Sequence, residues 1–304
     1  MVYFFPTKPL APAADDDLAA FVCFQAASCT VATIKNYLSA VRNYCLERLG
    51  TFTPLNERTA VLHAIQGAKR IRKDSTRPKL AITLETLRAL KAVLIDTANT
   101  ARATTRDNEH AVFTAILLGF FCALRKDNLT TGKKDPFNAN KGLRRADVMF
   151  HGDAAYVKLR SSKTNQFGAP AHLVPLMPNG TDLCPVAALR KHIELYPAAP
   201  DAPLLQFRYQ KQTRGMTHAT LVSNLKHALN TAGLNPRAYA GHSLRRGGAT
   251  LAFSLGAHEH QVRMLGAWAS DAVLRYNETS LKDKCDLPQR MALAAARDAQ
   301  PEWC

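Results

Sequence analysis

The chain has 304 residues, which is enough for two domains that each bury a core of their own. Hydrophobic residues make up 47% of it and charged residues 21%, as in an ordinary globular protein, and there is no internal repeat or low-complexity array. The 40 Lys and Arg residues against 24 Asp and Glu give a net charge of +16, which favours a polyanionic partner. Nucleic acid fits better than a membrane, because no basic amphipathic helix flanks a lipid anchor. The alternative is that the surplus charge only keeps the protein in solution.

Cysteine usage indicates a reducing compartment. The seven cysteines are odd in number and scattered, and none forms a C-x-x-C pair, so neither a disulfide framework nor a zinc site is predicted. His258 and His260 have no third ligand at a suitable spacing, and we assign them to the surface. The N-terminus lacks a basic region followed by a long apolar core, so we expect no signal peptide and an intracellular protein.

The first part of the chain predicts a small helical domain. Residues 1–14 are rich in Pro and Ala and are expected to be irregular. The next segment opens with acidic residues from Asp15, as helices often do, and a second segment has apolar residues three or four apart until Gly50 closes it. A third segment carries apolar residues on one side, at Val61, Leu62, Ile65 and Ala68. We expect these helices to form a domain over residues 15–75.

Six basic residues surround the connection that follows. They are Lys69, Arg70, Arg72, Lys73, Arg77 and Lys79. A run of this kind is often only a solvated surface. In a protein whose two domains clamp DNA, however, a linker over residues 76–82 crosses the duplex, and each phosphate contact then adds salt-dependent affinity. We prefer this interpretation and predict that the six residues bind DNA.

The second domain is expected to start near Ile82, with Thr83 as the cap of its first helix. Further on, Ala111 to Leu124 is a run of 14 residues without a charge, which is too short for a bilayer span and suits a buried core helix. Arg125 ends this run, so its guanidinium is anchored at the edge of the core and still reaches the surface. The alternative is an arginine that only extends its charge into solvent at a helix end.

Alternating residues predict a β-hairpin after the basic loop within residues 132–150. Val157 and Leu159 lie on one face of its first strand, and the second strand is HLVPL. Lys163 lies at the tip of this hairpin, where a lysine is usually only solvated.

Two amphipathic helices are then predicted and assigned to the scaffold. One starts at a proline in LCPVAALRKHIELYP. The other covers residues 213–234, with Leu221, Leu225 and Leu229 at spacings of four. Whether a face of the second helix lies in a DNA groove stays open.

The stretch from Gly241 to Tyr276 contains the strongest candidates for a functional site. Ser243 is suited to cap a helix over Leu244–Leu255, which places Arg245 in the first turn. Unpaired backbone N–H groups and the helix dipole make that turn favourable for a phosphate. His242 lies three residues before Arg245, so both side chains are able to face one point at the helix entrance.

Two further features of this stretch need an explanation. Gly247 and Gly248 are unfavourable inside a helix, so either DNA or a neighbouring helix is expected to approach their backbone closely. Ser270 is suited to cap a last short helix in which Val273 and Leu274 are buried while Tyr276 points elsewhere.

The ordered set resembles the catalytic C-terminus of the tyrosine recombinases, the phage-integrase family. It consists of H-x-x-R from His242, L-G-x-W ending at Trp268, and Tyr276 eight residues later. The sequences HSLRRGGAT and LGAWASDAVLRY look most like those of the eukaryotic mobile-element branch, the Crypton-type and tyrosine-recombinase retrotransposon enzymes. Upstream, TIKNYLSAVRNY is similar to the core-binding domain, ALRKDNL to the first arginine motif, and SKTNQFG to the hairpin turn that carries a catalytic lysine. The resemblance covers roughly residues 15–292.

The resemblance implies a mainly α fold with a small antiparallel β-sheet or hairpin. A helical core-binding domain at residues 15–75 would precede an α+β catalytic domain at 83–292, followed by a tail at 293–304. A C-terminal helix after Tyr276 would dock on a neighbouring subunit.

The resemblance also assigns catalytic roles to Arg125, Lys163, His242, Arg245, Trp268 and Tyr276. The phenol of Tyr276 would attack the phosphate with His242 as base, the two arginines would hold the phosphate oxygens, and Lys163 would protonate the leaving 5'-hydroxyl. Trp268 stands where many relatives have a second histidine, and its N–H only donates, so it would hold an oxygen without moving a proton; core packing is a compatible alternative. Arg246 is assigned to DNA binding. Asn128 stands where many relatives have Glu, so no carboxylate role is expected there.

The partners that the resemblance implies are double-stranded DNA and further copies of the chain, which would form dimers or tetramers on DNA. No cofactor, metal or membrane is expected, and a eukaryotic, element-encoded protein would act in the nucleus. Two rivals stay open: a type IB topoisomerase with the same chemistry, and a domesticated DNA-binding protein that no longer cuts. The target sequence is not predicted, because base contacts depend on docking geometry.

Overall fold

The computed structural model describes residues 14–72, 79–97, 103–132, 137–140, 142–160, 171–210, 212–268 and 271–276. The chain divides into two compact units, Met1–Pro78 and Lys79–Cys304, and the division falls inside the linker predicted at 76–82. Several predictions concern residues outside the described ones, namely those on Lys73, Arg77, Lys163, Ser270 and the chain beyond Tyr276. Within the described residues, no helix combines the length and apolar character needed to cross a membrane.

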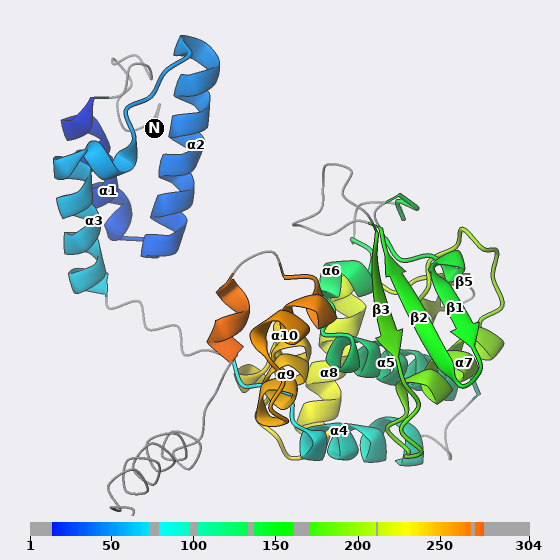
Figure 1. Ribbon diagram of the computed structural model, residues 1–304. Coiled ribbons are helices and arrows are strands. Elements are labelled where there is room, and N and C mark those ends of the chain that lie inside the picture. Colours follow the sequence, from blue (N-terminus) through cyan, green and yellow to red (C-terminus); the bar gives the residue numbers. More distant parts are fainter. Residues whose placement is uncertain are drawn as a thin grey trace, which may run out of the picture. The chain divides into compact units, whose positions relative to one another are not determined.

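The first unit is helical, as the sequence predicts (Figure 1). Its elements are α1 (Asp15–Ala26), α2 (Val31–Leu49), the 3-10 turn η1 (Leu55–Glu57) and α3 (Thr59–Arg72). Thr30 caps α2 by accepting a hydrogen bond from the Thr33 amide (3.2 Å), and Gly50 ends it with φ 71°. Leu18, Ile34, Leu38 and Val61 are fully buried between the helices, whereas Leu62 is 36% exposed, so its predicted place on the buried side of α3 is wrong.

The second unit is built around α5 (Ala103–Phe121), which packs against α7 (Pro185–Leu195), α8 (His218–Thr231) and α9 (His242–Ser254). The remaining helical elements are α4 (Leu84–Lys91), the π segment η2 (Ala92–Asp96), α6 (Lys126–Leu129), α10 (Glu259–Gly266) and the 3-10 helices η4 (Arg145–Asp147), η5 (Pro236–Ala238) and η6 (Asp271–Tyr276). Thr83 caps α4 as predicted, because its hydroxyl accepts from the Thr86 amide at 3.1 Å. The apolar run from Ala111 forms the buried second half of α5 as far as Phe121, whereas its last three residues, 122–124, are buried beyond the end of the helix.

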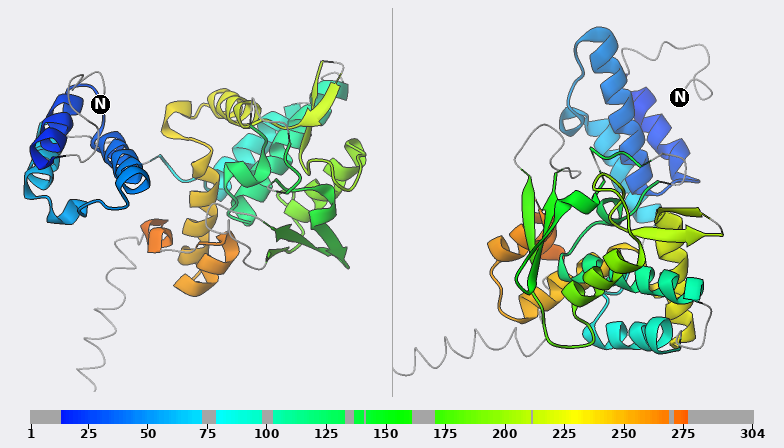
Figure 2. Two further views of the ribbon diagram at one scale, coloured as in Figure 1. Left: turned by 90° about the horizontal axis from the view of Figure 1, so that it is seen from above. Right: turned by 90° about the vertical axis from the view of Figure 1, so that its right-hand side faces the viewer.

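A small antiparallel sheet joins β1 (Val148–His151), β2 (Ala154–Leu159) and β3 (His172–Leu176) in that order. In the register, Val157 faces Val148 on one side and Val174 on the other, and Val157 and Val174 are fully buried. A separate ribbon pairs β4 (Gln206–Tyr209) with β5 (Gln212–Gly215), and Figure 2 shows the two sheets apart. The predicted fold class, mainly α with small antiparallel sheets, is confirmed.

Three local predictions are wrong. The helix predicted over residues 213–234 begins only at His218, because Thr217 caps it and the preceding residues pair as β5. Helix α9 begins at His242 and not at Leu244, since the Ser243 hydroxyl accepts from the amide of Ala240 (3.0 Å) and does not cap the helix. Leu274 is 44% exposed, whereas Val273 is buried as predicted.

The two glycines inside α9 allow protein segments to approach it. A Cβ on Gly247 would lie 2.1 Å from the carbonyl oxygen of Ile82, and one on Gly248 would lie 2.0 Å from that of Phe120. The Ile82 amide in turn donates to the Ser243 carbonyl at 3.1 Å. Of the two alternatives that the sequence left open, neighbouring protein backbone therefore accounts for both glycines, and it fixes α9 against α5.

Candidate active site

The site is built around a buried arginine in the first turn of α9. Arg245 is 1% exposed, and its Nη1 donates to the carbonyls of Ala123 and Gly266, the latter at 2.8 Å. Its guanidinium carbon lies 3.5 Å from the centroid of the Trp268 ring, which is a stacked cation–π contact. Two backbone segments and an aromatic face therefore fix the position of the charge.

Both carbonyl acceptors lie at left-handed turns of the backbone. Ala123 has φ 45°, and Ala267, directly after Gly266, has φ 51°. An L-residue in this region costs roughly 1–3 kcal/mol, and such strain persists only where the surroundings determine it. Gly266 is required for another reason, because a Cβ there would lie 2.0 Å from the Trp268 ring.

The Arg245 guanidinium also keeps two donors unused. Its Nε and Nη2 are buried without a hydrogen-bond partner among the described residues. Burial, followed by the charge of Arg125, lowers the pKa of Arg245 to about 9, and Tyr276 opposes this shift. The group is therefore still charged at pH 7, and its free N–H groups are suited to an anion.

Arg125 adds a second positive charge to the same place. Helix α5 ends at Phe121, the chain turns at Ala123, and Arg125 becomes the half-buried N-cap residue of α6. The turn carries Arg125 close enough to influence the charge state of both Arg245 and His242. The two arginines, 120 positions apart in the sequence, thus act on one region.

His242 and Tyr276 form a direct pair. His242 Nε2 is hydrogen-bonded to the Tyr276 hydroxyl, and the two ring centroids are 5.8 Å apart. Although part of His242 is exposed, desolvation by the surrounding protein lowers its pKa, and Arg245, Arg125 and Arg246 lower it further. A neutral imidazole is the form that accepts a proton, so this pair is suited to deprotonate the phenol.

The position of Tyr276 depends on a small apolar cluster. Val273 of η6 is fully buried against Ala123, Ala249, Val262 and Trp268. The rings of Trp268 and Tyr276 lie with centroids 6.0 Å apart. Trp268, 8% exposed, thus packs between the arginine and the tyrosine.

The strands on either side of the predicted lysine turn are attached to the rest of the unit. Lys163 itself lies outside the described residues. At the end of β2, Arg160 donates to the Asp147 carboxylate through Nε and Nη2, both at 2.8 Å. Burial alone would raise the pKa of Asp147, but these bonds and those from Arg144 hold it below its ordinary value. At the start of β3, His172 Nε2 donates to the carbonyl of Met264 in α10.

Several residues predicted to bind DNA have contacts within the protein. Lys79 Nζ donates to the Arg237 carbonyl and Arg246 Nη1 to the Lys79 carbonyl, each at 2.7 Å. In the first unit, Arg72 donates to the carbonyls of residues 26 and 27 at the end of α1 (3.1 and 3.2 Å). Lys69 and Arg70 are exposed. The DNA-binding role of these residues stays a prediction.

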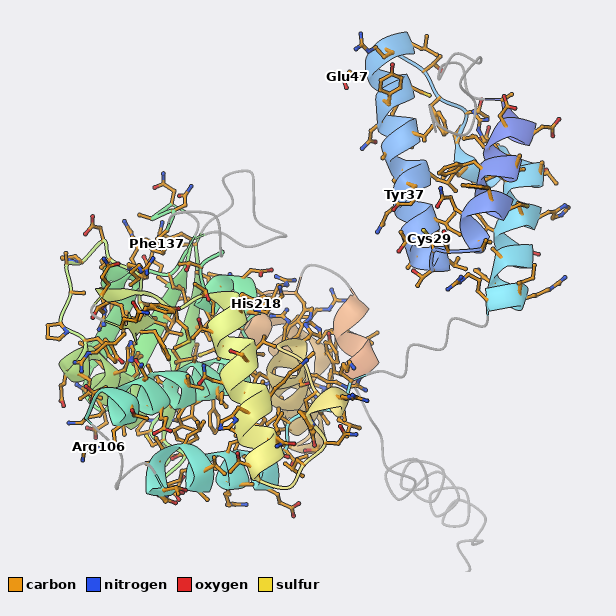
Figure 3. All side chains as sticks on the ribbon, turned by 180° about the vertical axis from the view of Figure 1, so that it is seen from behind. Cys29, Tyr37, Glu47, Arg106, Phe137 and His218 are labelled. Atoms are coloured by element: carbon orange, nitrogen blue, oxygen red, sulfur yellow. The ribbon has the colours of Figure 1, made fainter. Side chains whose placement is uncertain are left out.

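Two site neighbours were missed by the sequence analysis. A Cβ on Gly241 would lie 3.5 Å from Lys126 Cδ and 3.6 Å from His218 Cε1, so both side chains border the start of α9. Figure 3 labels His218 at the beginning of α8. Burial and then Lys126 lower the pKa of His218. The position of Lys126 beside Arg125 was a usable signal, whereas no local pattern connects His218 to the site.

Possible metal ligands are sparse in the part of the chain that the structure describes. It contains no group of three or more His, Cys, Asp or Glu side chains arranged to hold an ion. His258 and His260 stack on each other with centroids 5.8 Å apart. The described site therefore consists of two guanidinium groups, an imidazole, an indole and a phenol.

Comparisons with known proteins identify the fold. No protein-family model and no curated protein matches the chain. Among solved structures, the XerH site-specific recombinase bound to a palindromic difH substrate, a post-cleavage complex, has a TM-score of 0.63 at 20% identity, over 97% of this chain and 75% of that one.

Two further structures agree with this result. A lambda integrase dimer bound to a COC' core site has a TM-score of 0.56 at 15% identity, over 92% of this chain and 67% of that one. The Tn1549 transposon integrase in complex with circular intermediate DNA has a TM-score of 0.52 at 16% identity, over 92% and 86%. Because each of these alignments covers at least 92% of the chain, each extends over both compact units, and the chain therefore has the fold of the tyrosine recombinases.

Proposed function

We propose that the chain breaks and rejoins DNA strands through a covalent bond between Tyr276 and a DNA 3'-phosphate. The single observation that carries this proposal is the buried Arg245, which has two unused donors and lies close enough to Tyr276 for the phenol to influence its pKa, while the Tyr276 hydroxyl is hydrogen-bonded to His242. A phosphate would satisfy those donors and offset the neighbouring positive charges. The fold shared with recombinases and integrases supports the same activity.

The proposed reaction exchanges one phosphodiester bond for another. The Tyr276 oxygen attacks phosphorus while His242 Nε2 takes the phenolic proton, and a bond from phosphorus to the tyrosine replaces the bond to the 5'-oxygen. The leaving 5'-oxygen takes a proton from Lys163. Reversal with a different 5'-hydroxyl rejoins the strand, so the bond energy is conserved and no nucleotide cofactor is consumed.

The arginines would stabilise the charge that builds up on the two non-bridging oxygens. Arg245 is held before the substrate arrives by Ala123, Gly266 and Trp268, so little reorganisation is needed during the reaction. Arg125 would bind the second oxygen. We infer that the guanidinium groups supply the charge that a metal ion supplies in other phosphoryl-transfer enzymes, so the reaction proceeds without a metal.

The finer assignments rest on the sequence. The motifs HSLRRGGAT and LGAWASDAVLRY support an origin in a eukaryotic mobile element of the Crypton type, with action in the nucleus. The net charge of +16 supports double-stranded DNA as the substrate. Assembly of two or four copies on DNA, with residues 15–75 as a clamp, follows from the resemblance. The six basic residues around the linker and Arg246 are proposed to contact the DNA backbone.

The proposal is tested with a labelled duplex that carries a nick beside the cleavage site, so that the cut end diffuses away and the covalent product accumulates. Because the target sequence is unknown, a pool of random duplexes is used, and the DNA attached to denatured protein is sequenced. We expect an adduct that forms in EDTA, maps to Tyr276 by mass spectrometry and disappears in Tyr276→Phe.

Other outcomes would favour the rivals. Joining of the trapped end to a second duplex supports a recombinase, whereas relaxation of supercoiled DNA without joining supports a topoisomerase. DNA binding with no adduct at any nick would overturn the proposal in favour of a protein that no longer cuts.

A further inference from the structure

The attachment of the nucleophile's backbone is a separate feature of the site. Tyr276 is the last residue of η6, a 3-10 helix of only six residues. The final carbonyls of a helix have no partner within it and must find one elsewhere. The Tyr276 carbonyl accepts a hydrogen bond from the hydroxyl of Thr250 at 3.1 Å.

Thr250 belongs to the same helix as the predicted base and the buried arginine. A threonine inside a helix commonly donates to a carbonyl one turn back in its own helix. The single hydroxyl proton of Thr250 is directed out of α9 to another element. Helix α9 therefore holds Tyr276 at two points, the carbonyl through Thr250 and the phenol oxygen through His242.

The hydrogen bond from Thr250 adds a constraint that the apolar contacts of η6 do not supply. Val273 is fully buried in a cluster with Ala249, the neighbour of Thr250, whereas Leu274 is 44% exposed. Among the η6 side chains that the structure describes, Val273 is buried and Tyr276 is partly buried on the same cluster, and these contacts do not by themselves fix the direction of the Tyr276 backbone. A second attachment, at the Tyr276 carbonyl, fixes the point from which the phenol extends.

We propose that Thr250 is a positioning residue for the nucleophile, whose hydroxyl holds the Tyr276 carbonyl so that the phenol oxygen stays between His242 and the bound phosphate. This inference rests on the proposed function, since it assumes that Tyr276 is the nucleophile. Thr250 would not touch DNA. It would act on the rate of attack and not on the affinity for the substrate.

The test compares Thr250→Val, which keeps the shape and removes the donor, with Thr250→Ser, which keeps the donor. The rate of adduct formation is measured in single turnover with saturating nicked DNA, beside the dissociation constant for the same DNA. We expect Thr250→Val to react about tenfold more slowly with an affinity within about twofold of wild type, because a misplaced nucleophile reduces the fraction of reactive geometries. Thr250→Ser should react within about threefold of wild type, since its hydroxyl still reaches the carbonyl.

Thr114→Val is the matched control. The Thr114 hydroxyl is also buried at a contact between two elements, since it lies 2.9 Å from the His110 carbonyl of α5 and 3.2 Å from the Ala188 carbonyl of α7, and neither partner takes part in the proposed reaction. This variant should lower the melting temperature without slowing adduct formation. If Thr250→Val does not fold, Thr250→Ala is compared with Thr250→Ser in the same assay.

The outcomes separate this inference from the proposed function. Equal rates for wild type and Thr250→Val, with Tyr276→Phe inactive, would overturn the role of Thr250 alone. Thr250→Ser as slow as Thr250→Val, or an equal slowing in Thr114→Val, would also overturn it. An adduct that persists in Tyr276→Phe would instead overturn the proposed function.

Discussion

Among its described residues, the larger unit contains two buried arginines whose surroundings differ. Arg245 is 1% exposed and Arg145 is 9% exposed, and each has two guanidinium nitrogens without a partner among the described residues. Each also donates to main-chain carbonyls, Arg145 to that of Tyr196. Burial lowers the pKa of both. By burial and hydrogen bonding alone, the two would be equally good candidates for an anion site.

Their neighbours make the difference. Beside Arg145 lie the stacked rings of His192 and Tyr196, with centroids 4.9 Å apart. His192 is fully buried, and burial followed by the charge of Arg145 lowers its pKa to about 3, so it stays neutral at pH 7. The other charges near this region are paired, because Arg208, whose guanidinium lies over the Tyr196 ring, binds Asp107, and Asp147 binds Arg144 and Arg160.

Around Arg245, charges of the same sign accumulate beside a reactive hydroxyl. Arg125 and Arg246 lie close enough to lower the pKa of His242, and His242 is bonded to the Tyr276 hydroxyl. Such an arrangement is unfavourable until an anion arrives, and strain of this kind is typical of functional sites. A buried, partly unpaired arginine is thus weak evidence by itself, whereas several cations close to one reactive group are strong evidence.

Removing each guanidinium in turn tests whether Arg245 acts in the reaction while Arg145 does not, and it should give the largest effect. We expect Arg245→Met to slow adduct formation by about 10³-fold, the scale of losing a preorganised donor to the transition state. Arg145→Met should leave the rate within about twofold once the protein is folded. Single-turnover cleavage of nicked DNA measures both, with circular dichroism as the control for folding. A similar loss in both variants would show that Arg245 is only structural.

The next largest effect is a pH dependence of stability, and it arises from His192, beside Arg145. His192 has a pKa of about 3 in the folded protein and an ordinary histidine value near 6.5 when unfolded, so the unfolded state binds more protons as the pH falls below 6.5. Its contribution to the free energy of unfolding should therefore drop by ~2 kcal/mol between pH 7 and pH 5. Urea unfolding at the two pH values measures this drop. Glutamine does not titrate, so in His192→Gln the free energy of unfolding should differ less between pH 7 and pH 5 than in wild type. An unchanged difference in the free energy of unfolding would contradict the burial of a neutral imidazole.

The smallest effect is the charge coupling inside the site. In DNA-free protein, NMR titration should give His242 a pKa below that of an ordinary histidine, because desolvation and the nearby arginines disfavour its protonated form. Arg125→Gln removes one of these charges and should raise that pKa. Arg88→Gln, on α4, is a suitable control and should leave it unchanged. No response to Arg125→Gln would mean that the two groups are not neighbours.

Local signals in the sequence predicted much of the fold. Thr83 marks a helix start, Gly50 marks a helix end, and the alternation at Val157 identifies β2, because each signal depends on neighbours in the chain. The candidate site was predicted from the resemblance of its ordered motifs to those of the tyrosine recombinases. The structure joins His242, Arg245, Trp268 and Tyr276 by direct contacts, and Arg125 by its charge.

The remainder depends on contacts between distant segments. The β4–β5 ribbon was missed because each strand has only four residues and β5 contains no hydrophobic residue, and without a strand there the predicted helix extended over residues 213–215. The left-handed turns at Ala123 and Ala267 leave no trace in residue type, since alanine seldom adopts them. The bond from Thr250 to Tyr276 joins positions 26 apart, and neither residue signals it.

The most direct test of the central claim replaces one non-bridging oxygen of the cleavable phosphate with a methyl group, which removes its negative charge. If Arg245 binds and neutralises that charge, Arg245→Ala should lose much of its activity on the natural phosphate and recover a large part of it, relative to wild type, on the uncharged analogue. If Arg245→Ala is impaired by the same factor on both substrates, Arg245 does not act on the phosphate charge, and the proposed site is wrong.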